Sequence, residues 1–544
     1  MAAPGEAGAQ VLEGLMQDVQ LTLDLVLRRL ETVGATLEVS SATPSGVVHH
    51  SWGEIAERSR RMIAVLDALG LPPEASVATL AWNSHRHLEL FYAVPCSGRT
   101  LHTLNARVDP TRLVGQSERI GDSALFIDAS LTALLAEHRQ RLPPVVVVMD
   151  DGVEPHERFS DAPRYEDLVS AAEPRAELAV LREGQALAIA HTSGTTGSPK
   201  AVAYSHRAVV LHALCALSAD HHGVSRGAVV MPLTPMFHLM AWGLPYSTAL
   251  APARLVLAGA NNSPEALAAL IESERVTLAA GIPTFWVRLL DALEDPARDL
   301  SCLRRVVSGG APAPRPLAER YRAVGVEFVS SWGMTESNSG TTLRPEADRG
   351  DDSPTIRQGA AIAGVELRIV DSDGGELPWD DTAVGELEAR GPWVAAAYLD
   401  PDDDANERQF HDGWLRTGDL ARIDAGGSVE IVDRLKDPIK SGGEWISSSE
   451  LESHLARMPG VREAVVIAVN DETWGERPLA LLVAETAIDL DVDHLRGRLR
   501  EAVPRWWVPE RIELVSELPM TSVGKIDKQR LRERYAARAQ QQPS

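Results

Sequence analysis

The chain has 544 residues, which is too long for a single hydrophobic core and predicts one large lobe with a smaller lobe or several subdomains. With 44% apolar and 24% charged residues, its composition is that of an ordinary globular protein. The formal net charge of −24 argues against nucleic acid or an anionic membrane as the main partner. No apolar run approaches the roughly 18 residues of a membrane span. The N-terminal MAAPGEAGAQ also lacks the pattern of a signal peptide.

Cysteine and lysine are both used sparingly. The three cysteines lie far apart and offer no disulfide framework or metal-ligand spacing, which favours a reducing cytoplasm. Only five of the 53 basic residues are lysines, and all lie in three short motifs: Lys200, Lys436, Lys440, Lys525 and Lys528. Because lysine is a compact point charge and arginine a planar fork, we interpret these lysines as positions where arginine would not serve.

The first part of the chain predicts alternating helices and strands. After a loose tail over residues 1–10, the apolar spacing predicts a helix over residues 11–30. Buried strands are expected at residues 76–82, 123–127, 145–149 and 186–190, and helices at 116–120, 131–140 and 263–274. This alternation indicates layered α/β subdomains with mostly parallel sheets.

The pattern changes near residue 364 and again after residue 433. Strands expected at residues 365–370, 385–390 and 428–432 are separated by the turn sequences DSDGG and DAGG, which indicates a β-rich subdomain. Beyond it, helices are expected at 449–458 and 493–502, and strands at 463–469, 478–483 and 511–515. We therefore predict an α/β fold with an N-terminal domain of residues 1–433 and a small mobile α+β domain of residues 434–544.

A glycine-rich loop follows the strand expected at 186–190. Its sequence is HTSGTTGSPK, residues 191–200. Small residues let backbone N–H groups turn inward, hydroxyl groups add donors and Lys200 adds a mobile positive charge, which together suit a phosphate. The candidate phosphate-binding residues before the lysine are Thr192, Ser193, Gly194, Thr195, Thr196 and Gly197. It is not a Walker loop, because Ser198-Pro199 separates the last glycine from the lysine.

This loop and four later motifs resemble the adenylate-forming superfamily of acyl-CoA synthetases, luciferases and peptide-synthetase adenylation domains. The loop matches YTSGTTGxPKG, with His191 and Ala201 as departures. SSWGMTE at residues 330–336 matches YGxTE, with Trp332 in place of the tyrosine. The other matching segments are GWLRTGDL at 413–420, DRLKDPIKSGGEWISSSELE at 433–452 and PMTSVGKIDKQRL at 519–531. The segments PMFHLMAWGLPY and TLAWNSHRHLELFYAVPCSG are similar to bacterial medium- and long-chain fatty acyl-CoA synthetases.

The resemblance implies an ATP-dependent carboxylic acid:CoA ligase. The carboxylate would join the α-phosphate of ATP and release pyrophosphate, and the CoA thiol would then displace AMP. Glu336 would bind Mg²⁺, since a hard cation on phosphates prefers carboxylate oxygen. Thr335 would contact the α-phosphate, and Lys525 from the small domain would contact the carboxylate and α-phosphate oxygens.

The resemblance also assigns the rest of the nucleotide site. Asp419 would bind the ribose hydroxyls, and Arg434 would assist at the ribose or phosphate. The segment Gly309-Gly310-Ala311 would bind adenine. Trp332 and Gly333 would lie beside the adenine or the acyl pocket.

The resemblance also implies roles for residues of the small domain and of the acyl pocket. Lys436 would be the hinge of a rotating small domain, and Lys440, Gly442 and Gly443 would face CoA, whereas Lys528 is expected to be a surface charge. The acyl pocket is expected to be formed by His238, Trp242, Gly281, Gly309, Gly333 and Met334, and His238 is also a catalytic candidate that would flank the reacting carboxylate. These residues leave open whether the acid is a fatty acid or an aryl acid.

Two alternatives stay open. One is an adenylating enzyme with a second substrate other than CoA, such as an amide synthetase or an ATP-dependent diazotase that activates nitrite. The other is a non-catalytic nucleotide-binding protein. Many members of the superfamily are dimers, so a homodimer is one possible assembly, which the sequence does not decide.

Overall fold

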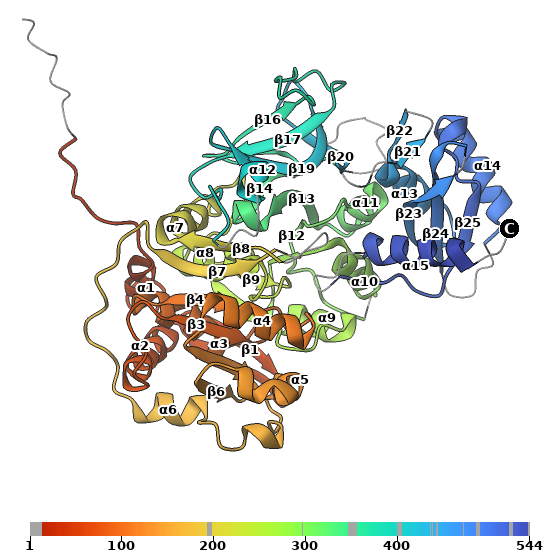
Figure 1. The fold of residues 1–544 in the computed structure, drawn as a ribbon. Helices are drawn as coiled ribbons and strands as arrows, with labels where there is room; N and C mark the ends of the chain where they lie inside the picture. The colour runs from red at the N-terminus through yellow and green to blue at the C-terminus, as the bar shows by residue number, and fades with distance from the viewer. Residues whose placement is uncertain are drawn as a thin grey trace, which may run out of the picture.

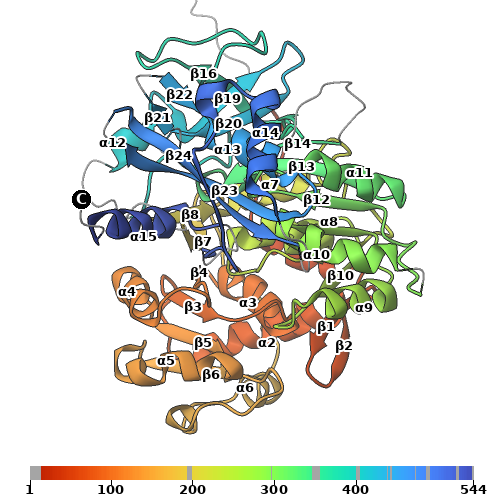
Figure 2. The same ribbon diagram turned by 90° about the vertical axis from the view of Figure 1, so that its right-hand side faces the viewer.

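A large lobe and a smaller C-terminal lobe make up the molecule (Figure 1). The computed structural model describes residues 14–192, 199–295, 297–345, 356–399, 405–435, 437, 439–441, 444–471, 473–485, 490–521 and 526–541. Viewed from the side, the small lobe with α13, α14 and α15 lies in front of the large one (Figure 2). The expected α/β architecture is thus confirmed.

The first sheet of the large lobe has both faces buried. Its order is β6 (Val145–Met149), β5 (Ala124–Asp128), β3 (Ser76–Leu80), β4 (Thr100–Thr103), β7 (Ala186–His191) and β8 (Ala201–Ser205). The pairs are parallel except β7 with β8. Along β5, Phe126 joins the core with α2 (Trp52–Ala68) and α3 (His85–Cys96), whereas Leu125 and Ile127 join the opposite core beside α4 (Pro110–Ile120). Such strands are continuously apolar because neither face meets water.

The second sheet is longer and forms the centre of the lobe. Its order is β15 (Ala360–Ala361), β14 (Ser339–Pro345), β13 (Glu327–Met334), β12 (Arg305–Ser308), β11 (Leu278–Gly281), β9 (Val229–Pro232), β10 (Arg254–Leu257), β1 (Glu38–Thr43) and β2 (Gly46–Ser51). The strands from β13 to β1 in this order are parallel. One face packs against α9 (Pro264–Glu274), α10 (Pro283–Glu294) and α11 (Arg315–Ala323).

The opposite face packs against α7 (His206–Cys215), α8 (Leu244–Leu250) and an antiparallel sheet. That sheet has the order β16 (Glu366–Val370), β17 (Gly385–Arg390), β19 (Trp414–Ile423) and β18 (Phe410–His411), with β20 (Val429–Arg434) also paired to β19. The helix α12 (Ala405–Gln409) precedes β18. The β-rich part predicted after residue 364 is therefore present.

The small lobe contains one sheet with helices on both faces. Its order is β22 (Glu444–Ile446), β21 (Ile439–Ser441), β24 (Gly475–Ala484) and β23 (Val461–Asp471), and β25 (Arg511–Leu514) pairs with β24. Val466 and Leu482 face α13 (Ser448–Ala456) and α14 (Val492–Ala502), whereas Val465 and Leu481 face α15 (Lys528–Gln541). The strict alternation explains why these strands could be recognised from their sequence.

The expected helix over residues 11–30 is mostly wrong. Only α1 (Asp24–Leu30) is helical, and α5 (Thr132–Leu135) with two 3₁₀ turns replaces the helix expected at 131–140. Leu15 and Met16 are about nine-tenths exposed. Helices in proteins depend on burial of an apolar face, so a helical spacing that meets no partner does not fold as a helix.

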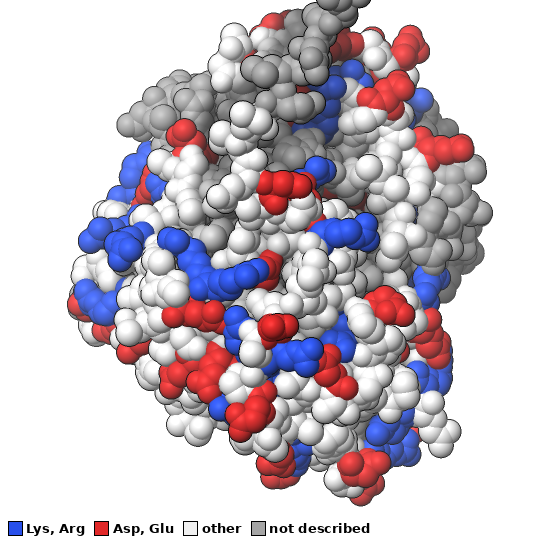
Figure 3. Space-filling model, turned by 90° about the vertical axis from the view of Figure 1, so that its left-hand side faces the viewer, with Lys and Arg blue, Asp and Glu red and all other residues white. Residues whose placement is uncertain are grey.

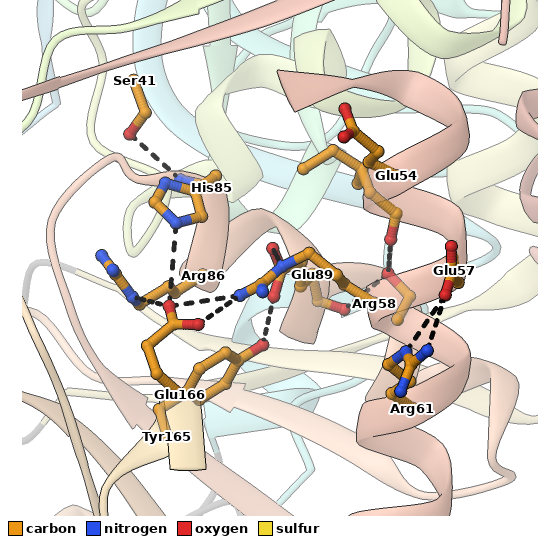
Figure 4. Close-up of polar contacts among 12 residues, drawn as sticks. Ser41, Glu54, Glu57, Arg58, Arg61, His85, Arg86, Glu89, Tyr165 and Glu166 are labelled. Carbon is orange, nitrogen blue, oxygen red and sulfur yellow. Dashed lines mark hydrogen bonds and ion pairs between the residues drawn. The ribbon is translucent and has the colours of Figure 1, made fainter. Parts of the chain in front are cut away.

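A buried polar cluster joins three helices of the N-terminal subdomain (Figure 4). The carboxylate of Glu89 on α3 accepts a hydrogen bond from Arg58 Nε on α2 at 2.7 Å and another from Tyr165 Oη at 2.6 Å. Tyr165 begins α6 (Tyr165–Ala171), and the next residue, Glu166, forms ion pairs with Arg58 and Arg86. Burial raises the pKa of Glu89, which Arg58 and Tyr165 partly offset. The cluster thus ties α2, α3 and α6 together.

The surface carries charges of both signs. On the face shown in Figure 3, positive and negative side chains are interspersed over the described residues. No helix of the described chain is long and apolar enough to cross a membrane.

Candidate active site

The sequence candidates of the large lobe converge where the parallel strands of the central sheet end. Trp242 follows β9, Gly281 ends β11, Gly309 follows β12 and Glu336 follows β13. Carboxyl ends of neighbouring parallel strands meet at one edge of a sheet, which is where ligands bind in open α/β folds. Because the motifs follow strands that end at the same edge of the sheet, the fold brings them together.

Glu336 is a buried carboxylate with one strong hydrogen bond. The Tyr398 hydroxyl donates to Glu336 Oε1 at 2.7 Å, and the backbone carbonyl of Glu336 accepts from the Ala395 N–H at 2.7 Å. Burial raises the pKa of Glu336, and the Tyr398 hydrogen bond opposes this rise. Among the described residues no cation lies within ion-pair distance of this carboxylate. It is therefore poised to accept a cation from a ligand.

The adjacent Thr335 is held through its backbone. Its carbonyl accepts a hydrogen bond from the Tyr204 hydroxyl at 2.8 Å. Tyr204 lies on β8, just after the glycine-rich loop, so this contact ties the loop to the segment after β13. Thr335 is buried at the start of a short 3₁₀ turn.

Lys200 lies next to the same tyrosine. Its Nζ is 4.6 Å from the centroid of the Tyr398 ring, a cation–π contact. The root of the loop is closed by two hydrogen bonds: the Thr192 N–H donates to the Lys200 carbonyl at 2.9 Å, and the Lys200 N–H donates to Thr192 Oγ1 at 3.0 Å. The loop residues Ser193, Gly194, Thr195, Thr196 and Gly197 lie outside the described residues.

A buried chain of side chains runs to the root of this loop. His191 Nε2 lies 3.0 Å from His102 Nε2, and His102 Nδ1 lies 2.8 Å from Asp122 Oδ2. Burial lowers the pKa of His191 to about 3, so its ring is neutral. Asp122 also accepts from Ser76 Oγ. The histidine that replaces the tyrosine of the motif is thus integrated into a polar network that the sequence did not reveal.

On the antiparallel sheet, Asp419 joins two other candidates. The Trp332 indole N–H donates to Asp419 Oδ2 at 2.8 Å, and Arg434 Nε lies 3.3 Å from Oδ1. Asp419 is buried, whereas about half of the Arg434 side chain is exposed. Both carboxylate oxygens therefore have protein partners, and Trp332 is oriented by its nitrogen as well as by packing.

Trp242 lies in a left-handed turn. Met240, Ala241 and Trp242 have φ values of 50°, 49° and 58°, and Gly243 follows at 70°. Left-handed geometry costs an L-residue on the order of 1–2 kcal/mol. The Trp242 ring packs so closely on Gly309 that an added Cβ would lie 3.1 Å from it. A side chain at position 309 would therefore require the Trp242 ring to shift by a few tenths of an ångström.

The remaining candidates of the large lobe line the same region. Gly281 is closely packed by Leu233, Phe285 and Trp286. Gly333 lies at a β-bulge between β13 and β14, next to the half-buried Met334. Gly310 has a φ of 83°, Ala311 is exposed and His238 is half-buried at the start of the turn that holds Trp242.

Most small-lobe candidates fall outside the described residues. These are Lys436, Gly442, Gly443 and Lys525. Lys440 is exposed on β21, and its N–H donates to Glu476 Oε2 at 2.9 Å.

The expectation that Lys528 is a surface charge is wrong. Its Nζ lies 2.8 Å from both Glu452 Oε1 and Ser448 Oγ, and its side chain is only 18% exposed. Ser448 in turn donates its N–H to Asp433 Oδ2 at 2.8 Å. Burial opposes the charge of Lys528, but Glu452, Asp433 and Asp437 outweigh it and raise its pKa. Spacing alone could not show that α15 packs this lysine against α13.

The site suits a magnesium ion that is brought with phosphates. The described residues contain no cluster of three or more histidine, cysteine or acidic side chains that could hold a metal by themselves. Mg²⁺ typically uses one or two carboxylates together with substrate phosphates. Glu336 offers one buried carboxylate that has no ion pair among the described residues, so the donor set fits.

Comparison with known proteins agrees with this geometry. Residues 35–399 match the AMP-binding enzyme family, and residues 450–525 match the AMP-binding enzyme C-terminal domain. A 3-methylmercaptopropionyl-CoA ligase of Ruegeria lacuscaerulensis is 40% identical over 92% of this chain and 95% of its own. A long-chain-fatty-acid–CoA ligase of Thermus thermophilus is 39% identical over 96% of both chains. The crystal structure of an anthranilate CoA ligase with anthranoyl-AMP has the same fold, with a TM-score of 0.87 at 24% identity over 96% of this chain and 99% of that one. The chain therefore belongs to the AMP-binding enzyme family, as its motifs indicated.

Proposed function

We propose that this chain, an ATP-dependent acid:CoA ligase, activates an aliphatic carboxylic acid through an acyl-adenylate. The observation that carries the proposal is that Lys200, which precedes β8 of the first sheet, lies beside Thr335 and Glu336, which follow β13 of the central sheet. Asp419, held by Trp332 and Arg434, supplies an acceptor for ribose hydroxyls on the neighbouring sheet. In this proposal, the protein groups that bind the phosphates, the metal and the ribose come from separate elements of the fold.

In this mechanism the protein orients the reactants and neutralises charge. The attacking carboxylate and the departing pyrophosphate are both anionic, so catalysis depends on positioning and on positive charge. Lys200 would contact the phosphates, Thr335 the α-phosphate, and Glu336 would hold Mg²⁺, which supplies charge neutralisation when bound. Lys525 of the small lobe would contact the carboxylate and the α-phosphate.

The second step needs no nucleophilic side chain. An acyl-adenylate is a mixed anhydride, so the CoA thiolate attacks its carbonyl carbon, the carbon–oxygen bond to AMP breaks, and AMP leaves. Lys440, Gly442 and Gly443 are the proposed CoA-facing residues, with the small lobe rotating at Lys436. A cytoplasmic location and a homodimer remain predictions from the sequence.

The aliphatic acid is supported by the relatives, because the contact between Trp242 and Gly309 does not distinguish an aliphatic from an aryl acid. Two relatives at about 40% identity are, by their names, ligases of aliphatic acids. His238 would lie at the mouth of the acyl pocket, and Met334 would form part of its wall. An aryl acid is the alternative substrate.

A panel of acids and acceptors tests this proposal. Purified protein is incubated with ATP, Mg²⁺ and a fatty, aryl or thioether acid, or nitrite, with and without CoA, and pyrophosphate, AMP and CoA are measured. We expect pyrophosphate release with aliphatic acids and stoichiometric CoA consumption. Pyrophosphate release with CoA left intact would show a different acceptor, such as an amine, and the absence of adenylation with every acid would indicate a non-catalytic binding protein.

The assignment of Lys525 has its own test. Lys525→Ala is expected to slow adenylation by about 100-fold or more while it spares CoA transfer from a supplied acyl-adenylate. The two half-reactions are measured separately. Normal adenylation by this variant would remove Lys525 from the proposed mechanism.

A further inference from the structure

Tyr398 is fixed in place by contacts on several sides. It is 5% exposed, and its ring packs against Phe410 with centroids 5.2 Å apart. Its N–H donates to Asn406 Oδ1 at 2.8 Å. The next N–H, of Leu399, donates to the carbonyl of Ala201 at 2.8 Å. The segment is therefore anchored both to α12 and to the residue directly after Lys200.

The side chain of Tyr398 contacts two groups that the proposed function places on ATP. Its hydroxyl donates to Glu336 Oε1 at 2.7 Å, and its ring face lies 4.6 Å from Lys200 Nζ. These contacts use different parts of the same residue. The hydroxyl restricts the carboxylate through Oε1, whereas the ring restricts the ammonium at the end of a flexible four-carbon stem.

Both restrictions have a physical purpose in a buried site. The Tyr398 hydroxyl holds one oxygen of the buried Glu336 carboxylate, so this side chain keeps one orientation before a cation arrives. A lysine without a partner would sample many rotamers and would lose that freedom when it meets a phosphate. A prepositioned carboxylate and ammonium avoid part of this loss.

We propose that Tyr398 is a positioning residue for metal–nucleotide binding, with its hydroxyl orienting Glu336 and its ring orienting Lys200. This inference rests on the roles that the proposed function gives to those two residues. The two effects can be separated because phenylalanine keeps the ring and loses the hydroxyl, whereas leucine loses both.

The test measures binding without turnover. Mn²⁺ replaces Mg²⁺, ATP is present, no acid is added, and free Mn²⁺ is measured by electron paramagnetic resonance. For Tyr398→Phe we expect about tenfold weaker Mn²⁺ binding, since hydrogen bonds to charged groups are strong. Binding of ATP in EDTA should change less than about twofold. For Tyr398→Leu, ATP binding in EDTA should also weaken, by about threefold.

Tyr165→Phe is the matched control. It removes the same hydroxyl from a buried tyrosine that donates to a buried glutamate, Glu89, at 2.6 Å, far from the site. It should lower the melting temperature and leave Mn²⁺ binding unchanged. The proposal is overturned if Tyr398→Phe binds Mn²⁺ as the wild type does, or if Tyr165→Phe weakens binding equally.

Glu336→Gln separates this inference from the proposed function. If Glu336→Gln itself binds Mn²⁺ normally, Glu336 is not a metal ligand and the proposed function fails at that point. If it binds Mn²⁺ weakly, Glu336→Gln/Tyr398→Phe should be no weaker than Glu336→Gln alone. A further tenfold loss in the double variant would mean that Tyr398 acts independently of Glu336, contrary to the proposal.

Discussion

Glu89 and Glu336 are two buried glutamates with the same tyrosine hydrogen bond and different surroundings. Tyr165 donates to Glu89 at 2.6 Å, and Tyr398 donates to Glu336 at 2.7 Å. Glu89 also has a guanidinium, Arg58, at 2.7 Å, whereas Glu336 has no cation at ion-pair distance among the described residues. A buried charge is costly unless it is paired. In this pair, the structural carboxylate has an ionic partner from the protein, whereas the carboxylate that is proposed to bind a metal has none among the described residues.

Replacement of Glu336 should give the largest functional effect. Glu336→Gln removes the only proposed protein ligand of the metal, and we expect adenylation to fall by about 100-fold or more. The melting temperature should not fall, because the fold loses a buried charge without an ionic partner. Initial rates of pyrophosphate release and thermal unfolding of the same preparation measure both. A large loss of stability with only a modest loss of rate would mean that Glu336, like Glu89, has a structural role.

Replacement of Glu89 should give the opposite result. Glu89→Gln leaves Arg58 with only Glu166 as ionic partner, and breaking a buried pair costs about 3 kcal/mol. Adenylation per folded molecule should change less than about threefold. Urea unfolding and active-site titration measure the two quantities. Specific loss of adenylation in fully folded protein would contradict the structural role of the cluster in Figure 4.

Lys528 extends the comparison to a buried cation. Lys528→Ala would leave Glu452 buried without its ion pair and should cost about 2 kcal/mol, whereas Lys528→Arg should recover most of it. The melting transition of each variant gives the measurement. Equal stability of the alanine variant and the wild type would restore the view of Lys528 as a surface charge.

Asp128 provides a test of this comparison, because it is buried, has no ion pair among the described residues and is not a site candidate. Burial raises its pKa to about 8, and the Trp82 N–H donates to Oδ2 at 2.8 Å. In the unfolded chain its pKa is about 3.9. The folded state holds this proton more tightly, so the stabilisation is complete below about pH 4 and is lost as the pH rises through 8.

The expected outcome for Asp128→Asn is a flatter pH dependence. Between pH 5 and pH 8 the wild type should lose on the order of 4 kcal/mol more free energy of unfolding than the variant. Adenylation should change less than about threefold. If adenylation falls as much as it does in Glu336→Gln, then Asp128 is also a functional residue. A buried carboxylate without an ion pair would in that case indicate function at both positions.

Several strands could be predicted because they are short apolar runs between turn residues, whereas the roles of the site residues stay predictions. The strand at 145–149 matches β6, and the strand at 385–390 matches β17. The family and the fold were also confirmed. Tyr398 was missed because it lies in an irregular segment, where no periodicity marks a residue that turns toward a distant glutamate. Lys528 was misjudged, since its partners come from α13, about 80 positions earlier in the chain.

The scarcity of lysine has a chemical consequence for an enzyme of this type. An acyl-adenylate that escapes the site can acylate amines, whereas guanidinium groups stay protonated and do not react. With only five lysines among 544 residues, the surface presents few such amines. Lys528 is further protected by its ion pair with Glu452. The arginine-rich surface thus makes the protein a poor target for its own reactive intermediate.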